Sequence, residues 1–386
     1  MTYDPIAFLE RVAGDVARDG SDAVAERVSR EELRAFTLAI DAIEPFSDLA
    51  SRWLVGPRGS GRVGAGIAGL WAWRCLLDGA TPDTILQQAA EEIANNRYEA
   101  WEIRPITGIT IGGKIKIAPN AYLCRDADIS RGGYYAAAFA EELFEPFGPC
   151  DMASLVQIFI VEPALIPMDA DRAVPKIETA RRAREAFAAR HRLAMGLVSG
   201  GPVEMPVVYG RGHRMNQLIH YDDGLFRQPV TPYFGRSLEV EILPLQLTAD
   251  LIERMDRGDV LSLTIDRLLR SRLSKTVEDR IIDLGMAAEI ALMHVAKGGG
   301  DGKGEITNKI SHRAAWLLGA DVDERARIAK VASDLYAARS IVVHTGSAPQ
   351  KYVQAISEYD QLIVDVAMAL LERGHFPDWK TLTLGG

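Results

Sequence analysis

The chain contains only three cysteines, Cys75, Cys124 and Cys150, among its 386 residues. Their number is odd, they lie far apart, and none has the short spacing that metal-binding motifs use. A disulfide framework and a cysteine-ligated metal are therefore not expected. The sequence instead predicts reduced thiols, no metal, no cofactor and a cytoplasmic location.

Long apolar runs are also absent. No uninterrupted run reaches the roughly 18–20 residues that a membrane-spanning helix requires. The start, MTYDPIAFLERVAGDVARDG, carries acidic residues early and lacks the basic-then-apolar order of a signal peptide. With 48% hydrophobic and 25% charged residues, the composition is that of a soluble globular protein with no membrane partner. The length predicts two or three domains, each large enough to bury a core.

A surplus of basic residues is missing too, since the formal net charge is -9. Affinity for nucleic acid is built largely from phosphate neutralisation, so a chain of this charge needs a local basic surface to bind RNA. Two segments offer one: the basic helical stretch over residues 176–192, and the cluster Arg267, Arg270, Arg272 and Lys275. In each case the alternative is an ordinary solvated helix face.

The pattern of the chain predicts an α+β multidomain fold with three parts. Residues 1–100 are expected to be helical, and residues 101–247 to be a mixed α/β, strand-rich region that would act as a sensor. Residues 248–386 are expected to form an all-α bundle, because helix follows helix with short loops.

Individual elements follow from periodicity and turn signals. Ser29 and Glu32 form a capping-box pattern at a helix start within the helical residues 4–55, and residues 81–95 predict another helix. In the middle part, alternation predicts a β-hairpin over residues 106–123, centred on Gly112-Gly113. A helix is expected over residues 134–143, with strands over residues 154–166, 201–210 and 237–247. Six helices are expected after that, over residues 249–257, 261–272, 277–296, 305–318, 324–343 and 349–373.

Glycine-rich segments match phosphate-binding patterns in part. Residues 59–64 and 64–69 fit the dinucleotide fingerprint, but only Trp53-Leu54-Val55 offers a preceding strand, and no acidic residue follows at the required spacing. Residues 108–114 fit Gly-x4-Gly-Lys, yet Ile115 replaces the metal-binding Ser or Thr, and a strand follows instead of a helix. A glycine loop before a helix, and a hairpin, are the favoured interpretations.

A polar segment between two expected strands holds His213, His220, Asp222 and Asp223. These residue types bind metals, but the set lacks the short paired spacing of known ligand motifs. A polar loop or a ligand-contact surface is therefore favoured over a metal site.

The stretch from Leu335 to Gly346 contains side chains that suggest a catalytic function. Arg339 and His344 lie at the end of a segment whose apolar residues recur at helical spacing, and Thr345-Gly346 is a helix-stop signal. His344 is thus expected at or just beyond the last turn, where exposed carbonyls favour a cation. On a straight helix the two side chains point about 140° apart. They converge only if the arginine reaches round or the helix unwinds at His344.

The surroundings of this stretch are similar to a known family. Residues 277–293, 305–319 and 323–346 read VEDRIIDLGMAAEIALM, EITNKISHRAAWLLG and DERARIAKVASDLYAARSIVVHTG, and they follow one another at short spacings. Together they resemble the Apea-like branch of the HEPN (higher eukaryotes and prokaryotes nucleotide-binding) families, within residues 260–373. The resemblance implies a small helical bundle, and many such domains are metal-independent ribonucleases with an Arg-x4–6-His motif.

By this resemblance, Arg339 and His344 would form a catalytic pair. Metal-independent cleavage uses the neighbouring 2′-OH of RNA as nucleophile, so the imidazole would transfer protons and the guanidinium would stabilise the phosphorane. The expected products are a 2′,3′-cyclic phosphate and a 5′-OH, and DNA should resist.

The resemblance also suggests supporting residues. Ser340 matches the Arg-Ser form of this branch. Glu289 would pair with Arg339 and hold its fork, as would Asp283, and Tyr336 would pack or hydrogen-bond beside the site.

Partners follow from the same resemblance. HEPN nucleases generally act as homodimers that join two motifs across one cleft, so Arg339 of one chain would face His344 of the other. The substrate would be RNA, with tRNA among the candidates. The chain would be a toxin or an anti-phage abortive-infection effector, with a phage-encoded trigger or an inhibitory partner.

Two alternatives stay open. The first is a non-catalytic HEPN module for nucleotide binding, RNA binding or assembly, and the second is an unrelated helical scaffold. In either, His344 would only cap its helix, and Arg339 would form an ion pair with Glu289 at the rim of the core.

Overall fold

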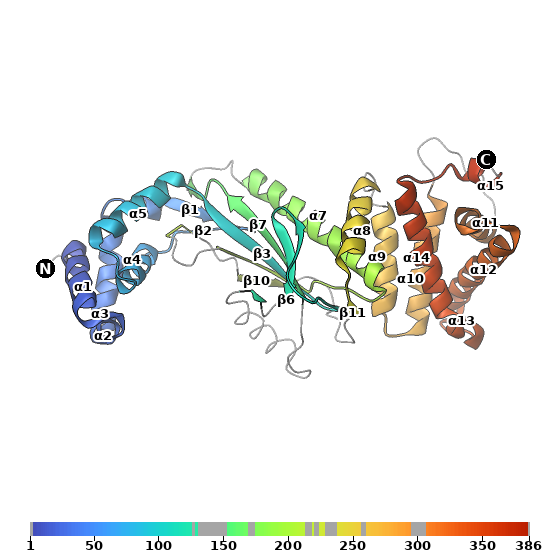
Figure 1. Cartoon of the computed structure of the whole chain (residues 1–386), viewed down its shortest axis with the longest axis horizontal. Helices are drawn as coiled ribbons and strands as arrows, with labels where there is room; N and C mark the ends of the chain where they lie inside the picture. The colour runs from blue at the N-terminus through green and yellow to red at the C-terminus, as the bar shows by residue number, and fades with distance from the viewer. Residues whose placement is uncertain are drawn as a thin grey trace.

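The computed structural model describes residues 3–125, 128–129, 153–168, 174–212, 218–219, 224–227, 238–255, 260–294 and 306–384. Figure 1 shows an elongated molecule with helices at its N-terminal end, a twisted sheet in the middle and a helical bundle at its C-terminal end. Every described strand lies before residue 240, and only helices follow. The expected α+β class, with strands before a helical C-terminal part, is therefore confirmed at this level. The domain boundaries at residues 100 and 247 stay predictions.

The N-terminal end is built from short capped helices. The Asp4 carboxylate accepts hydrogen bonds from the first free N–H groups of its helix, and Ser29 Oγ accepts from the Glu32 N–H at 3.1 Å, which confirms the expected cap. The rings of Phe8 and Phe36 stack with centroids 4.4 Å apart in the core between these helices. The helices are α1 (Pro5–Asp19), α2 (Ser21–Arg27), α3 (Arg30–Ala39), α4 (Ile67–Leu77) and α5 (Pro82–Asn95), with short 3₁₀ turns at Ile40–Ala42 and Leu49–Ser51.

The middle of the molecule is an antiparallel sheet with the strand order β10-β9-β3-β7-β6-β5. Its strands are β3 (Tyr98–Ile106), β5 (Ile115–Ala118), β6 (Ala121–Arg125), β7 (Ala153–Val161), β9 (Val207–Gly212) and β10 (Gly224–Arg227). A smaller antiparallel sheet has the order β2-β1-β8, from β1 (Arg52–Val55), β2 (Ser60–Arg62) and β8 (Leu165–Pro167). The short strands β4 (Ile109–Thr110) and β11 (Leu238–Glu239) pair in parallel.

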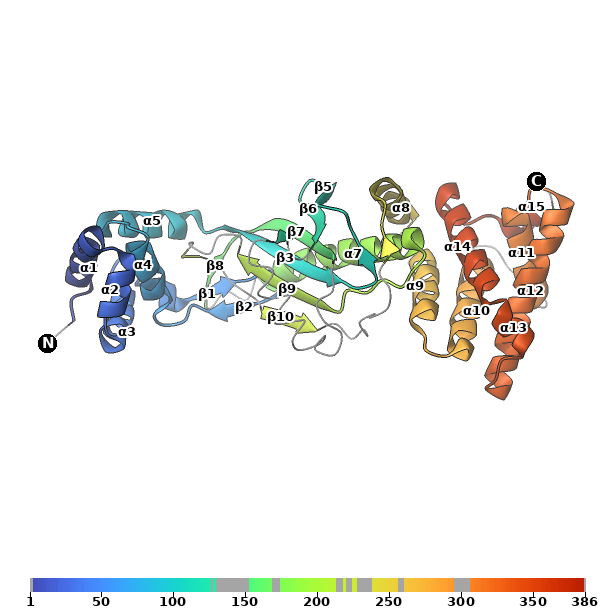
Figure 2. The same cartoon turned by 60° about the horizontal axis from the view of Figure 1, so that its bottom comes forward.

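Helix α7 (Val174–Ser199) connects the sheet to the bundle. It crosses one face of the sheet, and its C-terminal turns reach the first helices of the bundle (Figures 1 and 2). A Cβ at Gly196 would lie 2.3 Å from Cδ2 of Leu269 in α9 (Val260–Leu273), so α7 and α9 meet where α7 has no side chain. The confirmed helical reading of residues 176–192 thus belongs to a longer, packed helix.

The C-terminal bundle packs around α10. This helix contacts α9, α11, α12 and α14, and its inward residues Leu284, Ala287 and Ala291 are fully buried. The helices are α8 (Ile242–Met255), α9 (Val260–Leu273), α10 (Val277–Met293), α11 (Ile306–Leu318), α12 (Val322–Thr345), α13 (Gln350–Gln354), α14 (Ile356–Arg373) and α15 (Trp379–Thr383). In the described parts of the chain, no helix is long and apolar enough to cross a membrane.

Among the described residues, buried apolar side chains form two large clusters and one small one. The N-terminal core joins α1–α5 to the start of β3 and to β8, whereas the C-terminal core joins the end of β3, the C-terminal half of α7 and the whole bundle. The small cluster lies on the other face of the sheet, around Trp101 and Tyr209.

Three strand predictions need correction. Residues 242–247 are the start of α8 and not a strand, because Leu245, Ala249 and Ile252 are buried at helical spacing in the C-terminal core. The hairpin turn lies at Pro119-Asn120, between β5 and β6, and not at Gly112-Gly113. The strand expected over residues 154–166 is divided at Pro163 into β7 and β8, which belong to different sheets.

Two other expectations have different outcomes. The strand expected over residues 201–210 starts only at Val207, and Glu204 before it forms a single bridge with Thr107. The helix expected over residues 134–143 lies outside the described residues.

Candidate functional site

Helix α12 positions both residues of the Arg-x4-His motif. The carboxylate of Asp321 caps its start. At its end, Gly346 has φ 72° and its N–H donates to the Val342 carbonyl at 2.8 Å, a left-handed cap that suits glycine. The helix stays regular through Thr345, so His344 lies inside the last turn and the helix does not unwind there.

Arg339 lies on the side of α12 that packs against α10. A Cβ at Gly285 of α10 would be 2.7 Å from both Cβ and Cγ of Arg339, so the aliphatic stem rests on bare backbone. The guanidinium Nη2 lies 3.4 Å from Glu289 Oε2, and its Cζ is 5.6 Å from the centre of the Tyr336 ring. The side chain is 28% exposed, and its buried Nε has no hydrogen-bond partner within the described structure. The expected pairing of Glu289 with Arg339 is therefore present, with one edge of the guanidinium uncommitted.

His344 points away from this contact. It is exposed, beside Val343, whose side chain is 56% exposed. The imidazole makes no hydrogen bond to any described residue, and the hydroxyl of Thr345 donates to the Ile341 carbonyl at 2.8 Å instead. His344 does not act as the cap. Because α12 is regular, Arg339 and His344 leave it on different sides, and one chain does not bring them to one phosphate.

Asp283 does not hold Arg339, and this expectation is corrected. Its Oδ1 lies 3.0 Å from Arg267 Nη1, an ion pair between α10 and α9. Asp283 and Glu289 are six residues apart, which places them about 120° apart around the helix, so both cannot face Arg339. Ser340 is half-buried and has no described hydrogen bond through its side chain.

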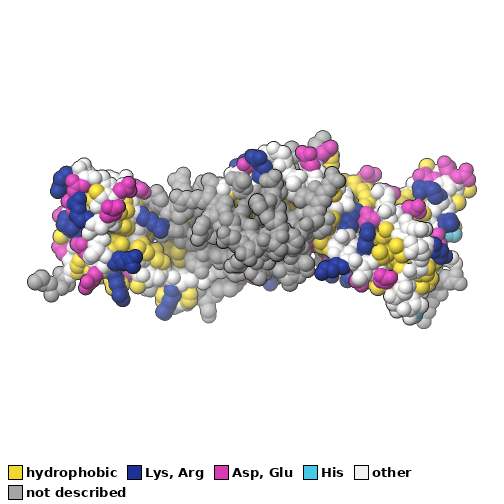
Figure 3. Space-filling model, turned by 90° about the horizontal axis from the view of Figure 1, so that it is seen from below, with side chains coloured by type: hydrophobic (Ala, Val, Ile, Leu, Met, Phe, Trp, Pro, Cys, Tyr) yellow, Lys and Arg dark blue, Asp and Glu magenta, His cyan; other side chains and the backbone are white. Residues whose placement is uncertain are grey.

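The basic cluster ahead of the bundle is not one surface. Arg272 is 6% exposed and makes a two-pronged ion pair with Asp360 at 3.0 and 2.7 Å, while its Nη1 donates to the Gly196 carbonyl at 2.8 Å. It ties α9 to α14 and α7, so its assignment to RNA binding is corrected. Arg270 is 57% exposed and pairs with Asp266, and Lys275 is exposed. On the face seen in Figure 3, basic and acidic side chains are interspersed over the described bundle.

The basic stretch of α7 is also divided. Arg182 is 74% exposed and pairs with Glu178 on its own helix, as a solvated face would. Arg184 and Arg192, by contrast, are only 11% and 17% exposed and pair with carboxylates of the sheet region. The side chain of Lys176 lies outside the described residues.

The glycine motifs do not build phosphate loops. Strand β1 turns back into β2 as an antiparallel hairpin, which is not the strand-helix-strand unit that the fingerprint needs. At the start of α4, the N–H of Gly66 donates to Asp41 Oδ2 at 2.7 Å, so a carboxylate occupies the position that a phosphate would take. Strand β5 follows Lys114, as expected.

Metal and thiol chemistry receive little support from the described residues. They contain no group of three or more His, Cys, Asp and Glu side chains placed to hold a metal ion. The polar set His213, His220, Asp222 and Asp223, like Cys150, lies outside the described residues. Cys75 and Cys124 are buried and form no disulfide in the described structure, and burial, the largest cause, raises the pKa of Cys75 to about 11.

The clefts formed by described residues include two that are lined by charged side chains, and neither of these is lined by Arg339 or His344. The first, of about 320 Å³, lies between the start of α12 and α14, beside Arg327 and Asp365. The second, of about 790 Å³, lies beside α7 and is lined by Arg104, Arg192 and Glu204 among others. The second cleft was not predicted from the sequence. The signal for it was the pair of charged residues Glu102 and Arg104 in a strand whose other residues, apart from Glu99, are apolar.

No protein-family model, curated protein or solved structure matches this chain.

Proposed function

We propose that this chain is a metal-independent endoribonuclease of the HEPN type that acts as a homodimer. One observation carries the proposal: α12 presents an exposed imidazole in its last turn and, five residues earlier, a guanidinium held by Glu289 and Tyr336. Because the two side chains diverge, the active site would combine Arg339 of one protomer with the partner's His344. The exposed Val343 beside the imidazole would contribute apolar surface to such a contact.

The chemistry of the two groups suits RNA cleavage. An imidazole accepts the proton of the 2′-OH, O2′ forms a bond to phosphorus, and the bond from phosphorus to O5′ breaks as O5′ takes up a proton. The guanidinium is permanently charged and forked, which fits the charge that develops on the phosphorane oxygens. The products are a 2′,3′-cyclic phosphate and a 5′-OH end. DNA lacks the 2′-OH and is not a substrate.

The proposed role is that of a toxin or an anti-phage abortive-infection effector acting on cellular RNA, with tRNA as a candidate substrate. A nuclease of this kind needs restraint, so we include a phage-encoded trigger or an inhibitory partner in the proposal.

The direct test is sequencing of cellular RNA ends after brief expression of the wild type and of His344→Ala. New 5′-OH ends should appear with the wild type and not with His344→Ala. His312→Ala, which removes another exposed histidine of the bundle, is the matched control and should cleave as the wild type does. Equal cleavage by the wild type and His344→Ala would sink the proposal.

The composite site has its own test. Arg339→Ala and His344→Ala are each inactive in this proposal, but a mixed dimer of the two keeps one intact site. Random mixing of equal amounts should restore about one quarter of wild-type cleavage, because half of the dimers are mixed and each holds one of two sites. No recovery in a mixture that exchanges subunits would show that the site does not form across protomers.

A second candidate is a non-catalytic HEPN module for binding or assembly. The observation that favours it is the ion pair of Arg339 with Glu289, which is also what a rim contact would look like. RNA affinity that survives His344→Ala, with no cleavage by either protein, would support this reading over the nuclease.

A further inference from the structure

Charged residues interrupt the core beneath α7. Along this face of β3, Tyr98 and Ala100 belong to the N-terminal core and Ile106 to the C-terminal core. Between them lie Glu102 and Arg104, which are 0% and 5% exposed. Burying charge in this way is costly unless it is fully paired, so a buried ionic group in an apolar sheet points to a function.

More guanidinium groups than carboxylates surround Glu102. Glu102 accepts from Arg104 and from Arg184 Nε at 3.0 Å, and its Oε2 lies 3.6 Å from Arg58 Nη1. Three guanidiniums thus share one fully buried carboxylate. Arg58 has a second acid partner, Glu185, at 2.8 Å. The Nε of Arg104 is buried and has no hydrogen-bond partner among the described residues.

Arg104 also lines the cleft of about 790 Å³ that opens toward α9 and α10. Inside it, Glu204 lies 3.0 Å from Arg192, and Asp266 pairs with both Arg192 and Arg270. These two carboxylates and two arginines balance one another. Burial, the largest cause, raises the pKa of Glu204, which favours its neutral form and further reduces the negative charge.

The lining itself is balanced, with four basic side chains (Arg104, Arg192, Arg270 and Lys275) and four acidic ones (Glu185, Glu204, Asp266 and Asp283). The ion-pair partners just outside the cleft add Arg58, Arg181 and Arg267 against Glu102, so the site and its immediate surroundings carry a positive surplus. Lys275 at the rim has no ion-pair partner in the described part of the chain. Lys275, and Arg104, which shares the Glu102 carboxylate with two other arginines, therefore remain for a ligand. A local surplus of this sign, in a chain of net charge -9, favours an anion.

We propose that this cleft binds a small molecule that carries a phosphate chain. Arginine forks and a lysine ammonium are the groups that recognise phosphate, and the volume lies in the range of small-molecule sites. Ala188, Met205 and Leu273 give the cleft an apolar wall for the organic part of the ligand. The site is separate from Arg339 and His344 and does not depend on the nuclease proposal.

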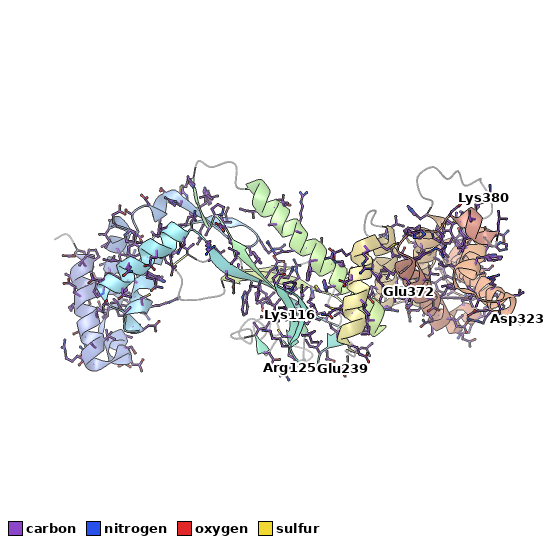
Figure 4. The ribbon with its side chains drawn as sticks, turned by 45° about the horizontal axis from the view of Figure 1, so that its top comes forward. Lys116, Arg125, Glu239, Asp323, Glu372 and Lys380 are labelled. Carbon is purple, nitrogen blue, oxygen red and sulfur yellow. The ribbon has the colours of Figure 1, made fainter. Side chains whose placement is uncertain are left out.

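The test measures binding of ATP, pyrophosphate and adenosine to the full-length His344→Ala protein by calorimetry, so that RNA cleavage plays no part. ATP and pyrophosphate should bind and adenosine should not. Lys275→Gln should weaken both affinities about tenfold, because it removes one charge-assisted contact. Lys380→Gln, at the far end of the bundle (Figure 4), should leave them unchanged.

Arg104→Gln should abolish binding, with circular dichroism to show that the protein is folded. Lys275 is exposed, so its variant tests the site even if Arg104→Gln fails to fold. The proposal is overturned if adenosine binds as tightly as ATP, if neither phosphate compound binds at millimolar concentration, or if Lys275→Gln and Lys380→Gln behave alike. A short single-stranded RNA that binds the cleft more tightly than ATP would overturn it too.

Discussion

The stem of Arg339 lies directly on the backbone of Gly285, where a Cβ would be 2.7 Å from two of its carbons. Both residues are at the contact between α12 and α10, which is one of the main contacts of the bundle. Glycine at position 285 therefore lets the guanidinium extend along α10 to Glu289. The orientation of the proposed catalytic arginine depends on a residue that has no side chain.

Gly285→Ala should separate α12 from α10 or displace Arg339. Overpacking of this kind costs about 1–3 kcal/mol of unfolding free energy. Cleavage of RNA should fall with it. Denaturant unfolding and an RNA cleavage assay measure the two effects. The control is Gly14→Ala in α1, where a Cβ meets nothing within 4 Å, and where the helix should gain about 0.5–1 kcal/mol. Equal stability of the two variants would contradict the close approach.

Glu289→Gln should separate orientation from stability. Its ion pair with Arg339 joins side chains that are 28% and 35% exposed, so unfolding free energy should change by less than about 1 kcal/mol. The rate of RNA cleavage should fall roughly tenfold, since a guanidinium without its carboxylate samples more orientations. Glu289→Asp should recover part of the rate. An unchanged rate in Glu289→Gln would show that the pair does not position Arg339.

Arg272 and Arg270 should behave in opposite ways. Arg272→Gln leaves Asp360 without its two-pronged partner in a site where the arginine is 6% exposed, so it should cost about 3–5 kcal/mol of stability. Arg270→Gln removes a pair within one helix, at a side chain that is 57% exposed, and should cost about 0.5 kcal/mol. Chemical denaturation of both variants checks this. Similar losses would mean that Arg272 does not hold the helices together.

His191 should make stability depend on pH. It is 5% exposed, its Nδ1 lies 2.9 Å from the Phe187 carbonyl, and burial is the largest cause that lowers its pKa from 6.5. Below pH 6.5 the unfolded chain takes up a proton that the folded chain refuses. Stability is thus full above that pH and is lost as the pH falls toward the folded pKa, by at most about 1.4 kcal/mol per pH unit.

The comparison for this prediction is His191→Gln, which cannot titrate. Arg190, Asp250 and Glu253 also influence the pKa of His191. The free energy of unfolding of both proteins should therefore be measured with denaturant at each pH. The wild type should lose more stability than the variant between pH 7.5 and 5.5. Parallel curves would show that His191 is not the group responsible.

Local signals in the sequence predicted much of the helical structure. Ser29 caps its helix as expected, and the apolar spacing in residues 261–343 gave helices close to their true limits. Those signals depend on residues that are close together along the chain, so they can be recognised in the sequence. The single helix expected over residues 349–373 is divided at Ala355 into α13 and α14. The strand prediction was wrong at residues 242–247. Their alternating pattern favours a strand, but Leu245 is buried at helical spacing with Ala249 and Ile252, and this burial determines the conformation.

Contacts between distant residues could not be predicted. Arg272 is 88 positions from Asp360, and no periodicity shows that one charge will neutralise the other. Nothing in the sequence distinguishes Gly285 from another helical glycine, and only the structure shows that the stem of Arg339 packs against it. The pairing of Glu289 with Arg339 was anticipated through the family resemblance, but the cleft beside Arg104 is assembled from five separate parts of the chain.

The charged residues Glu102 and Arg104 between the two large cores have a thermodynamic consequence. Unfolding is cooperative where apolar contacts are continuous, and here the continuity is broken across a single strand. On heating, the two ends of the chain should therefore melt in separate steps. A calorimetric trace of the whole protein would then contain two heat-absorption peaks. A ligand that contacts both sides of this charged region would reduce the difference between the two melting temperatures.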